Sequence, residues 1–202
     1  MIEVKSLHPL FAAEVRGLDL GQPLDAATLR LIKDAFAHHS VLVFRDQDVP
    51  DEQQIAFSEN FGSLERTKVG TPGAGSPLVV LTNIGADGSI TPPTDKQILN
   101  NKANQHWHAD SSFKAVPAKA SMLSARIIPS KGGNTEYLSM RAAYAALPPA
   151  KRAQIDGLVA IHDYAYGRSK IDPNLVTDEE RRVVPPVRQA VVLDHGAFGK
   201  SL

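Results

Sequence analysis

The order of apolar segments along the chain constrains its fold more than any other feature of the sequence. Helical spacing of apolar residues is confined to the stretches after Asp25 and Pro50 and to residues 140–156. Short runs rich in β-branched and aromatic residues are typical of strands, as in 41–44, 78–81, 120–128 and 135–138. Strands and helices do not alternate, which argues against a Rossmann-type sheet. The sequence therefore predicts a mainly β fold, a sandwich with peripheral helices.

Capping residues predict where the helices begin and end. Asp25 is the expected N-cap of the first helix. Ser139 is the expected N-cap of a helix over 141–147, and Pro-Pro separates this helix from the next. His38 and His39 fall at the end of the first helix, where a histidine can interact with the last carbonyls.

Composition limits the class of protein. A chain of 202 residues suffices for one domain with a full core, and we expect a single domain over 1–202. Basic and acidic residues number 22 each, without a basic stripe, which disfavours nucleic-acid binding. No apolar run approaches the roughly 18 residues that span a bilayer, and the start is not a secretory signal, so no membrane partner is expected.

The absence of cysteine narrows the metal chemistry. It excludes disulfides and thiolate metal sites, and it is compatible with the reducing cytoplasm, where we expect the protein. Any metal site must use His, Asp or Glu. Such a ligand set suits Fe(II) or Mn(II) better than structural zinc.

Two residues of metal-binding type stand two positions apart in the segment 104–110. In a β-strand, residues i and i+2 project from one face about 6.6 Å apart at Cα, so His108 and Asp110 can converge on one ion. With another histidine they would form the two-His-one-carboxylate triad of non-haem Fe(II) enzymes. His106 shares that face but lies about 13 Å from Asp110 along a straight strand. Trp107 faces the other way and is expected in the core.

A series of motifs in chain order carries a resemblance to a known family. The motifs are 7–13 (LHPLFAA), 40–45 (SVLVFR), 53–57 (QQIAF), 107–113 (WHADSSF), 121–125 (SMLSA), 132–137 (GGNTEY), 140–144 (MRAAY) and 162–163 (HD). With them the chain resembles the taurine dioxygenase family of Fe(II)/α-ketoglutarate-dependent dioxygenases. Within that family it is most similar to the dichlorophenoxyacetate (aryloxyalkanoate) branch.

The resemblance implies a fold, a cofactor and a reaction. The fold is a double-stranded β-helix, the cupin-like jelly roll, with Fe(II) held by His108, Asp110 and a later histidine. α-Ketoglutarate and O₂ are co-substrates, and Thr135 matches the threonine that hydrogen-bonds the distal α-ketoglutarate carboxylate, although threonine is also a good strand residue. The implied reaction hydroxylates a small organic acid, an aryloxyalkanoate or a sulfonate, with succinate and CO₂ as co-products.

Four further residues are candidates for substrate binding. By the resemblance, Asn104 matches an asparagine that faces substrate, and Arg168 and Ser169 lie in a segment that borders it. Lys68, in a Gly-rich loop, could meet a substrate carboxylate. Each of these residue types also serves in turns or on solvated surfaces. Residues 85–104 are expected to form a long loop, and such loops often cover sites. The protein is expected to be a homo-oligomer.

The C-terminal residues 190–202 predict a hairpin whose second strand stops after three residues. Related dioxygenases continue here, and their remaining part carries the distal histidine ligand and the arginine that binds α-ketoglutarate. We therefore expect an incomplete jelly roll and a third ligand beyond Leu202. His162 and His195 are local alternatives for that ligand, but both match family histidines with structural roles.

Two other functions stay open. The chain could be an inactive relative that acts as a binding or remnant protein, because its triad is incomplete. It could instead be a cupin-type metalloenzyme that uses His106, His108 and another histidine with a different metal. Substitution of His106 separates this reading from the dioxygenase.

Overall fold

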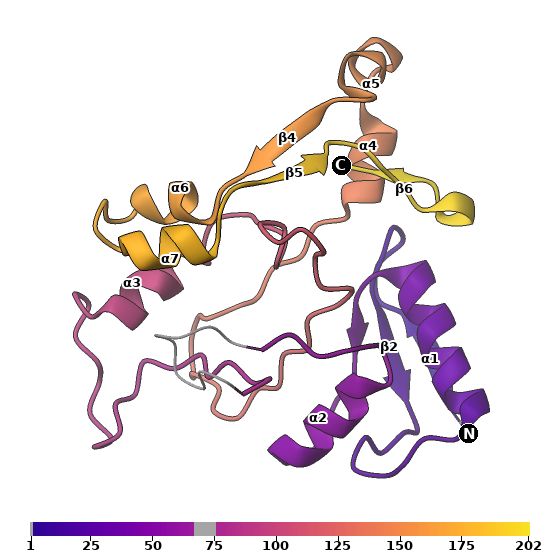
Figure 1. Ribbon diagram of the computed structural model, residues 1–202. Coiled ribbons are helices and arrows are strands. Elements are labelled where there is room, and N and C mark those ends of the chain that lie inside the picture. The colour runs from indigo at the N-terminus through magenta and orange to yellow at the C-terminus, as the bar shows by residue number, and fades with distance from the viewer. Residues whose placement is uncertain (1, 67–75) are drawn as a thin grey trace. The chain divides into compact units, whose positions relative to one another are not determined.

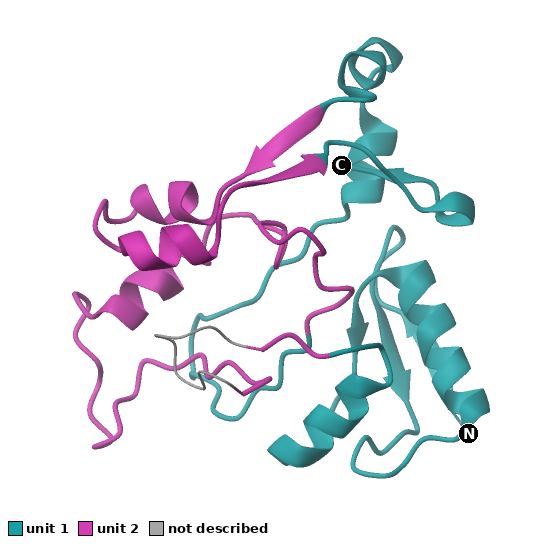
Figure 2. Cartoon of the chain, viewed as in Figure 1, with its two compact units in different colours: residues 1–63, 122–158, 190–202 teal, residues 64–121, 159–189 magenta. Residues whose placement is uncertain are grey.

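A computed structural model describes residues 2–66 and 76–202 (Figure 1). The chain divides into two compact units, each built from segments that are far apart in the sequence (Figure 2). Unit 1 comprises residues 1–63, 122–158 and 190–202, and unit 2 comprises residues 64–121 and 159–189. None of the helices in the described ranges is long and apolar enough to cross a membrane.

The first three strands of unit 1 form one sheet in the order β1-β2-β3. β1 (Glu3–Ser6) and β2 (Ala13–Arg16) are antiparallel, and Val4 pairs with Val15. β3 (Leu42–Val43) is parallel to β2, and the helix between them makes the crossover. The prediction that strands and helices do not alternate is therefore wrong for this β-α-β part of the chain.

The crossover helix α1 (Ala26–His39) begins where its capping residue predicts. The Asp25 carboxylate accepts a hydrogen bond from the Thr28 N–H at 2.7 Å, which satisfies one of the unpaired donors of the first turn. Ile32 and Ala35 lie on the inner face of the helix, and Ile32 is fully buried. Burial of this stripe joins α1 to the rest of unit 1.

The C-terminal end of α1 is capped by an arginine from a distant part of unit 1. Arg141 donates hydrogen bonds to the carbonyls of Ala37 at 3.1 Å and His38 at 2.8 Å, and to the Ser40 hydroxyl at 2.5 Å. Burial, with additional contributions from His38 and Arg141, lowers the pKa of His39, which disfavours a charged ring at this position. Arg141 thus places a cation at the last carbonyls of α1, a contact that the sequence did not predict.

The core of unit 1 continues into α2 (Asp51–Glu59). Phe57 packs against Phe44 and Phe61, with ring centroids 5.9 Å and 5.6 Å away. The buried apolar residues of this part are Ala13, Val15, Ile32, Ala35, Val49 and Phe57. They form the apolar centre expected for the N-terminal elements.

The remaining elements of unit 1 lie near the C-terminus and agree with prediction. α4 (Met140–Ala146) begins at Ser139, whose side chain accepts from the Ala142 N–H, and α5 is Pro149–Ile155. β6 (Leu193–Asp194) and β7 (Lys200–Ser201) are antiparallel around the short 3-10 helix η1 (Gly196–Phe198). The C-terminal hairpin is therefore confirmed.

Unit 2 is richer in helix than predicted. Its helices are α3 (Lys96–Ala103), α6 (Tyr164–Ser169) and α7 (Asp178–Val183), and β4 (Val159–His162) pairs with β5 (Val187–Ala190). α3 occupies part of the expected long loop 85–104. Its N-cap is Asp95, whose side chain accepts from the Gln97 N–H at 2.8 Å.

Four predicted strands are not strands in the structure, namely 78–81, 104–110, 120–128 and 135–138. A strand needs a neighbour for its N–H and C=O groups, and within the described residues no strand pairs with these segments. Several of their apolar side chains are exposed, including Val79, Leu123, Ile127 and Leu138. The described residues thus form three small sheets, with less strand than the predicted jelly roll requires.

Candidate metal centre

The ligand segment, residues 104–121 of unit 2, is a succession of turns and not the predicted strand. The backbone N–H groups of Asn104, Gln105 and His106 bond to carbonyls three residues earlier, as an extension of the end of α3. A turn has no core-facing side of the kind a strand has. The Trp107 side chain is 64% exposed, so the prediction that it packs in the core is wrong.

Within these turns, the two predicted ligands do converge. His108 Nε2 and Asp110 Oδ1 lie 3.2 Å apart, and both side chains are substantially exposed. Two ligand atoms, each about 2.1 Å from one ion, are about 3.0–3.4 Å apart for angles between 90° and 109°. The separation therefore suits adjacent positions on a single metal ion.

A hydrogen bond to the backbone fixes which nitrogen of His108 is available. Nδ1 of His108 lies 2.7 Å from the carbonyl oxygen of His106. A carbonyl only accepts, so Nδ1 carries the hydrogen, and in the neutral ring Nε2 presents its lone pair to the Asp110 carboxylate. Two lone-pair atoms at 3.2 Å repel each other unless a proton or a metal cation lies between them. A divalent cation fits this donor pair.

The second oxygen of Asp110 is also held. Ser121 donates its hydroxyl to Asp110 Oδ2 at 2.6 Å, which leaves Oδ1 directed at His108. Hydrogen bonds of this kind orient metal-binding carboxylates and tune their affinity. Ser121 is a positioning residue that sequence reasoning missed, because nothing in the sequence connects it with position 110.

Glu65 anchors the turn that follows Asp110. Its carboxylate accepts from the Ser111 hydroxyl at 2.8 Å and from the Lys114 ammonium. Ser111 takes the left-handed conformation, with φ of 57°, which a serine adopts only when its surroundings hold it there. Gln189 donates to the Ser112 and Lys114 carbonyls on the same turn.

No third ligand joins the pair in the described part of the chain, where no group of three or more His, Cys, Asp or Glu side chains can hold a metal ion together. His195 Nε2 contacts the Ser201 hydroxyl at 2.8 Å across the C-terminal hairpin, a structural contact of the kind predicted. His162 ends β4, and the next residue, Asp163, caps α6 by accepting from the Ala165 N–H.

The other predicted residues fall in different places. Thr135 is exposed and belongs to unit 1, after two glycines with φ of 75° and 73°. Asn104 is the C-cap of α3 and is exposed. Ser169 donates its hydroxyl to the Tyr166 carbonyl at 2.8 Å. Lys68 lies outside the described residues.

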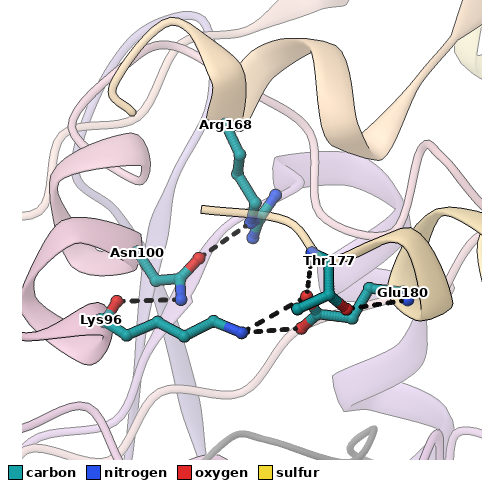
Figure 3. Close-up of polar contacts among 5 residues, drawn as sticks. All are labelled: Lys96, Asn100, Arg168, Thr177 and Glu180. Carbon is teal, nitrogen blue, oxygen red and sulfur yellow. Dashed lines mark hydrogen bonds and ion pairs between the residues drawn. The ribbon is translucent and has the colours of Figure 1, made fainter. Parts of the chain in front are cut away.

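Arg168 is the predicted substrate residue with the most defined surroundings. Its Nε donates to the Asn100 side-chain oxygen at 3.1 Å (Figure 3). Its guanidinium lies over the Tyr164 ring, 3.8 Å from the ring centroid. Asn100 and Tyr164 are additional residues that sequence reasoning missed. Their helices, α3 and α6, are far apart in the sequence and were not predicted.

Comparison with known proteins decides the family. The model of the taurine catabolism dioxygenase TauD, TfdA family matches residues 3–201. The chain belongs to the TauD/TfdA family. This match includes both units and the whole ligand segment.

Individual TauD/TfdA relatives are similar over most of the chain. The α-ketoglutarate-dependent 2,4-dichlorophenoxyacetate dioxygenase of Cupriavidus pinatubonensis is 38% identical over 200 residues, which are 96% of this chain and 70% of that protein. The (S)-phenoxypropionate/α-ketoglutarate dioxygenase of Sphingobium herbicidovorans is 36% identical over 84% of this chain and 56% of its own.

A solved structure shows that the fold is shared. The crystal structure of AAD-2 in complex with Mn(II) and N-oxalylglycine superposes with a TM-score of 0.88 at 40% identity. The match covers all of this chain and 70% of AAD-2. The chain therefore has the TauD/TfdA-family fold over the matched region.

Proposed function

We propose that the protein is an Fe(II)- and α-ketoglutarate-dependent dioxygenase that hydroxylates a small organic acid of the aryloxyalkanoate class. The observation that carries this proposal is the 3.2 Å approach of His108 Nε2 to Asp110 Oδ1 in a chain of the TauD/TfdA family. Relatives named for dichlorophenoxyacetate and phenoxypropionate support the aryloxyalkanoate class. Sulfonates are the second substrate class to test.

The roles of the residues follow from their chemistry. His108 and Asp110 would hold Fe(II), and Ser121 would fix the carboxylate orientation through its bond to Oδ2. When bound, Fe(II) would supply the coupled oxidation by O₂ of α-ketoglutarate to succinate and CO₂ and of the substrate to its hydroxylated product, with one oxygen atom going to each. The complex of AAD-2 with Mn(II) and an α-ketoglutarate analogue supports both ligands.

Thr135 would donate its hydroxyl to the distal carboxylate of α-ketoglutarate, which orients the co-substrate. The residues proposed to face the substrate are Asn104, Lys68, Arg168 and Ser169. Of these, Lys68 and Arg168 carry the positive charge that complements an organic acid. Both units would belong to one dioxygenase domain, because the family match runs through both.

The third metal ligand is proposed to be a histidine from the part of the relatives that this chain does not cover. The chain spans 70% of the Cupriavidus relative and of AAD-2. By the family resemblance, that remaining part also supplies the arginine for α-ketoglutarate and the strands that complete a jelly roll. Strands added there would be candidates to pair with segments such as 120–128.

A comparison of two protein forms tests the proposal. One form is the 202-residue chain, and the other is extended with the uncovered C-terminal part of the Cupriavidus relative. We expect calorimetry with Mn(II) to show weak or no binding by the first form and firm binding by the second, because three ligands hold an ion better than two. Equal, tight binding by both would place a third ligand within residues 1–202, with His162 and His195 as candidates.

Succinate release measures the reaction itself. The extended form should release succinate from α-ketoglutarate with phenoxyacetates in a panel of small carboxylates and sulfonates. Release of succinate with sulfonates alone would mean that the substrates are sulfonates and not aryloxyalkanoates. No release from any member, with metal firmly bound, would favour an inactive relative.

A further inference from the structure

The guanidinium of Arg168 is held in place without a negatively charged contact. Its Nε donates to a neutral amide, the Asn100 Oδ1 (Figure 3). The face of the guanidinium lies on the Tyr164 ring. The Tyr164 ring in turn packs against Phe113 of the ligand segment, with centroids 4.9 Å apart. The side chain is half-buried. Arg168 is thus oriented by two neighbours and neutralised by neither.

The orientation of the Asn100 amide is fixed from its other end. Asn100 Nδ2 donates to the Lys96 carbonyl at 3.0 Å, one turn earlier on α3. The amide nitrogen is therefore occupied, and the oxygen must face Arg168. This arrangement presents an acceptor to Nε and leaves the terminal Nη atoms directed elsewhere (Figure 3).

Glu180, the carboxylate that acts electrostatically on Arg168, has other contact partners. Both oxygens of Glu180 lie 3.3 Å from the Lys96 ammonium, and one accepts the Thr177 N–H at 2.7 Å (Figure 3). Burial lowers the pKa of Arg168, and electrostatic contributions from Tyr164 and then Glu180 oppose this shift in part. Arginine stays protonated in proteins, so the result is a half-buried cation whose charge is uncompensated by contact.

Within the described residues, no side chain forms an ion pair with Arg168, and its Nη atoms have no hydrogen-bond acceptor there. We propose that Arg168 is a receptor for the carboxylate of a small organic acid, which binds through both Nη atoms, and that Asn100 and Tyr164 are its positioning residues. The two parallel N–H bonds of a guanidinium match the two oxygens of a carboxylate. That the ligand is the substrate rests on the proposed dioxygenase function, whereas carboxylate binding does not.

A purely structural role makes a different prediction, in which Arg168 only ties α6 to α3. Asn100→Asp separates the two roles. It replaces the neutral acceptor with a carboxylate. This change strengthens the contact with Arg168 but neutralises the charge that a ligand would bind. If Arg168 has only the structural role, Asn100→Asp should keep or raise the thermal stability and should have no effect on ligand binding. A receptor predicts weaker ligand binding at unchanged or higher stability.

The test is a titration of the 202-residue chain with phenoxyacetate, in the presence of a chelator and followed by NMR or calorimetry. Phenoxyethanol, which lacks the charge, is the ligand control. We expect saturable binding of phenoxyacetate only, weakened at least about tenfold by Asn100→Asp and by Arg168→Gln, since a charge-assisted bidentate contact is lost. Arg168→Lys keeps the charge and should lose most of the affinity, because the planar fork is gone.

Lys170→Gln is the matched control variant, because it removes a cation that lies over a neighbouring ring, Tyr166 at 4.6 Å, on the same part of the chain. It should bind phenoxyacetate as the unmodified chain does. Absence of saturable binding, or equal binding by Asn100→Asp, overturns the receptor. Equal binding of phosphate or methanesulfonate overturns the carboxylate class. Carboxylate binding by a chain whose extended form never releases succinate would refute the dioxygenase and leave the receptor standing.

Discussion

The N-terminal part of unit 1, residues 2–61, and the ligand segment of unit 2 are held by different kinds of contact. The first has a three-stranded sheet, a capped helix and a set of buried apolar residues around Ile32 and Phe57. The second has no buried residue and is fixed by side-chain hydrogen bonds such as those of Ser121 and Glu65. Stability should therefore depend on the first region and metal geometry on the second.

The largest effect is expected from the metal ligands. In the extended protein, His108→Ala or Asp110→Ala should abolish Mn(II) binding and succinate release, since each removes a direct ligand. His106→Ala should keep much of both, because His106 contributes its backbone carbonyl to the site and not its ring. The free energy of unfolding should change little in all three variants. A His106→Ala variant as damaged as His108→Ala would favour the cupin-type enzyme.

The opposite pattern is expected in the core of unit 1. Ile32→Ala removes a fully buried side chain and should lower the free energy of unfolding by about 2–5 kcal/mol in a urea titration. Leu31→Ala, on the same helix but 37% exposed, is the control and should cost much less. Equal losses for the two variants would mean that α1 does not pack as described.

Ser121 tests whether hydrogen bonds alone hold the site. Ser121→Ala frees Asp110 Oδ2 and should weaken Mn(II) binding by the extended form by about 10- to 100-fold, with unchanged stability. Ser58→Ala removes a hydroxyl that donates to the Gln54 carbonyl in unit 1 and should leave metal affinity unchanged. An unaltered affinity in Ser121→Ala would remove Ser121 from the site.

Thr135 tests the proposed co-substrate contact. Thr135→Val keeps the shape and deletes the hydroxyl, so it should raise the α-ketoglutarate requirement of the extended form by about 1 kcal/mol, and by up to about 3 if the carboxylate cannot re-pair with water. Thr135→Ser retains a hydroxyl and should keep the α-ketoglutarate requirement at the level of the unmodified protein. Loss of metal binding in Thr135→Val would show a different role.

The smallest effect concerns the N-cap of α1. Hydrogen bonds from Thr28 lower the pKa of Asp25 in the folded protein. A lowered carboxyl pKa stabilises the fold above the unfolded value near 3.9, and this contribution is lost as the pH falls through the folded pKa. Asp25→Asn keeps a capping oxygen but does not titrate. Below about pH 4 the difference in stability between the two proteins should shrink, as thermal unfolding at several pH values would show.

Local signals in the sequence predicted the parts that local physics decides. Asp25 and Ser139 were predicted as N-caps and cap α1 and α4, and the C-terminal hairpin forms around its glycines. The spacing of His108 and Asp110, together with the family resemblance of the residues around them, singled out this pair, and the two side chains do approach each other. The strand expected over 104–110 is wrong, because turns bring the two side chains together.

The contacts that sequence reasoning missed join residues far apart in the chain. Ser121 reaches Asp110 across eleven positions, and Arg168 reaches Asn100 across 68. Asn100 lies on α3 and Arg168 on α6, and neither helix has an apolar face strong enough to be predicted. α3 has no buried residue, and α6 has only Ala165. The predicted strands failed for a related reason, because a β-type run becomes a strand only where another chain segment pairs with it.

The Arg141 cap of α1 also determines when the contacts of this helix can be completed during synthesis. Arg141 stands 101 to 104 residues after the groups that it contacts at the helix end. During synthesis, α1 leaves the ribosome long before Arg141 has been added to the chain. Until then, the last carbonyls of the helix are hydrogen-bonded to water. Contacts of such long sequence separation slow folding. The N-terminal region thus becomes complete only after the chain has been made at least as far as Arg141.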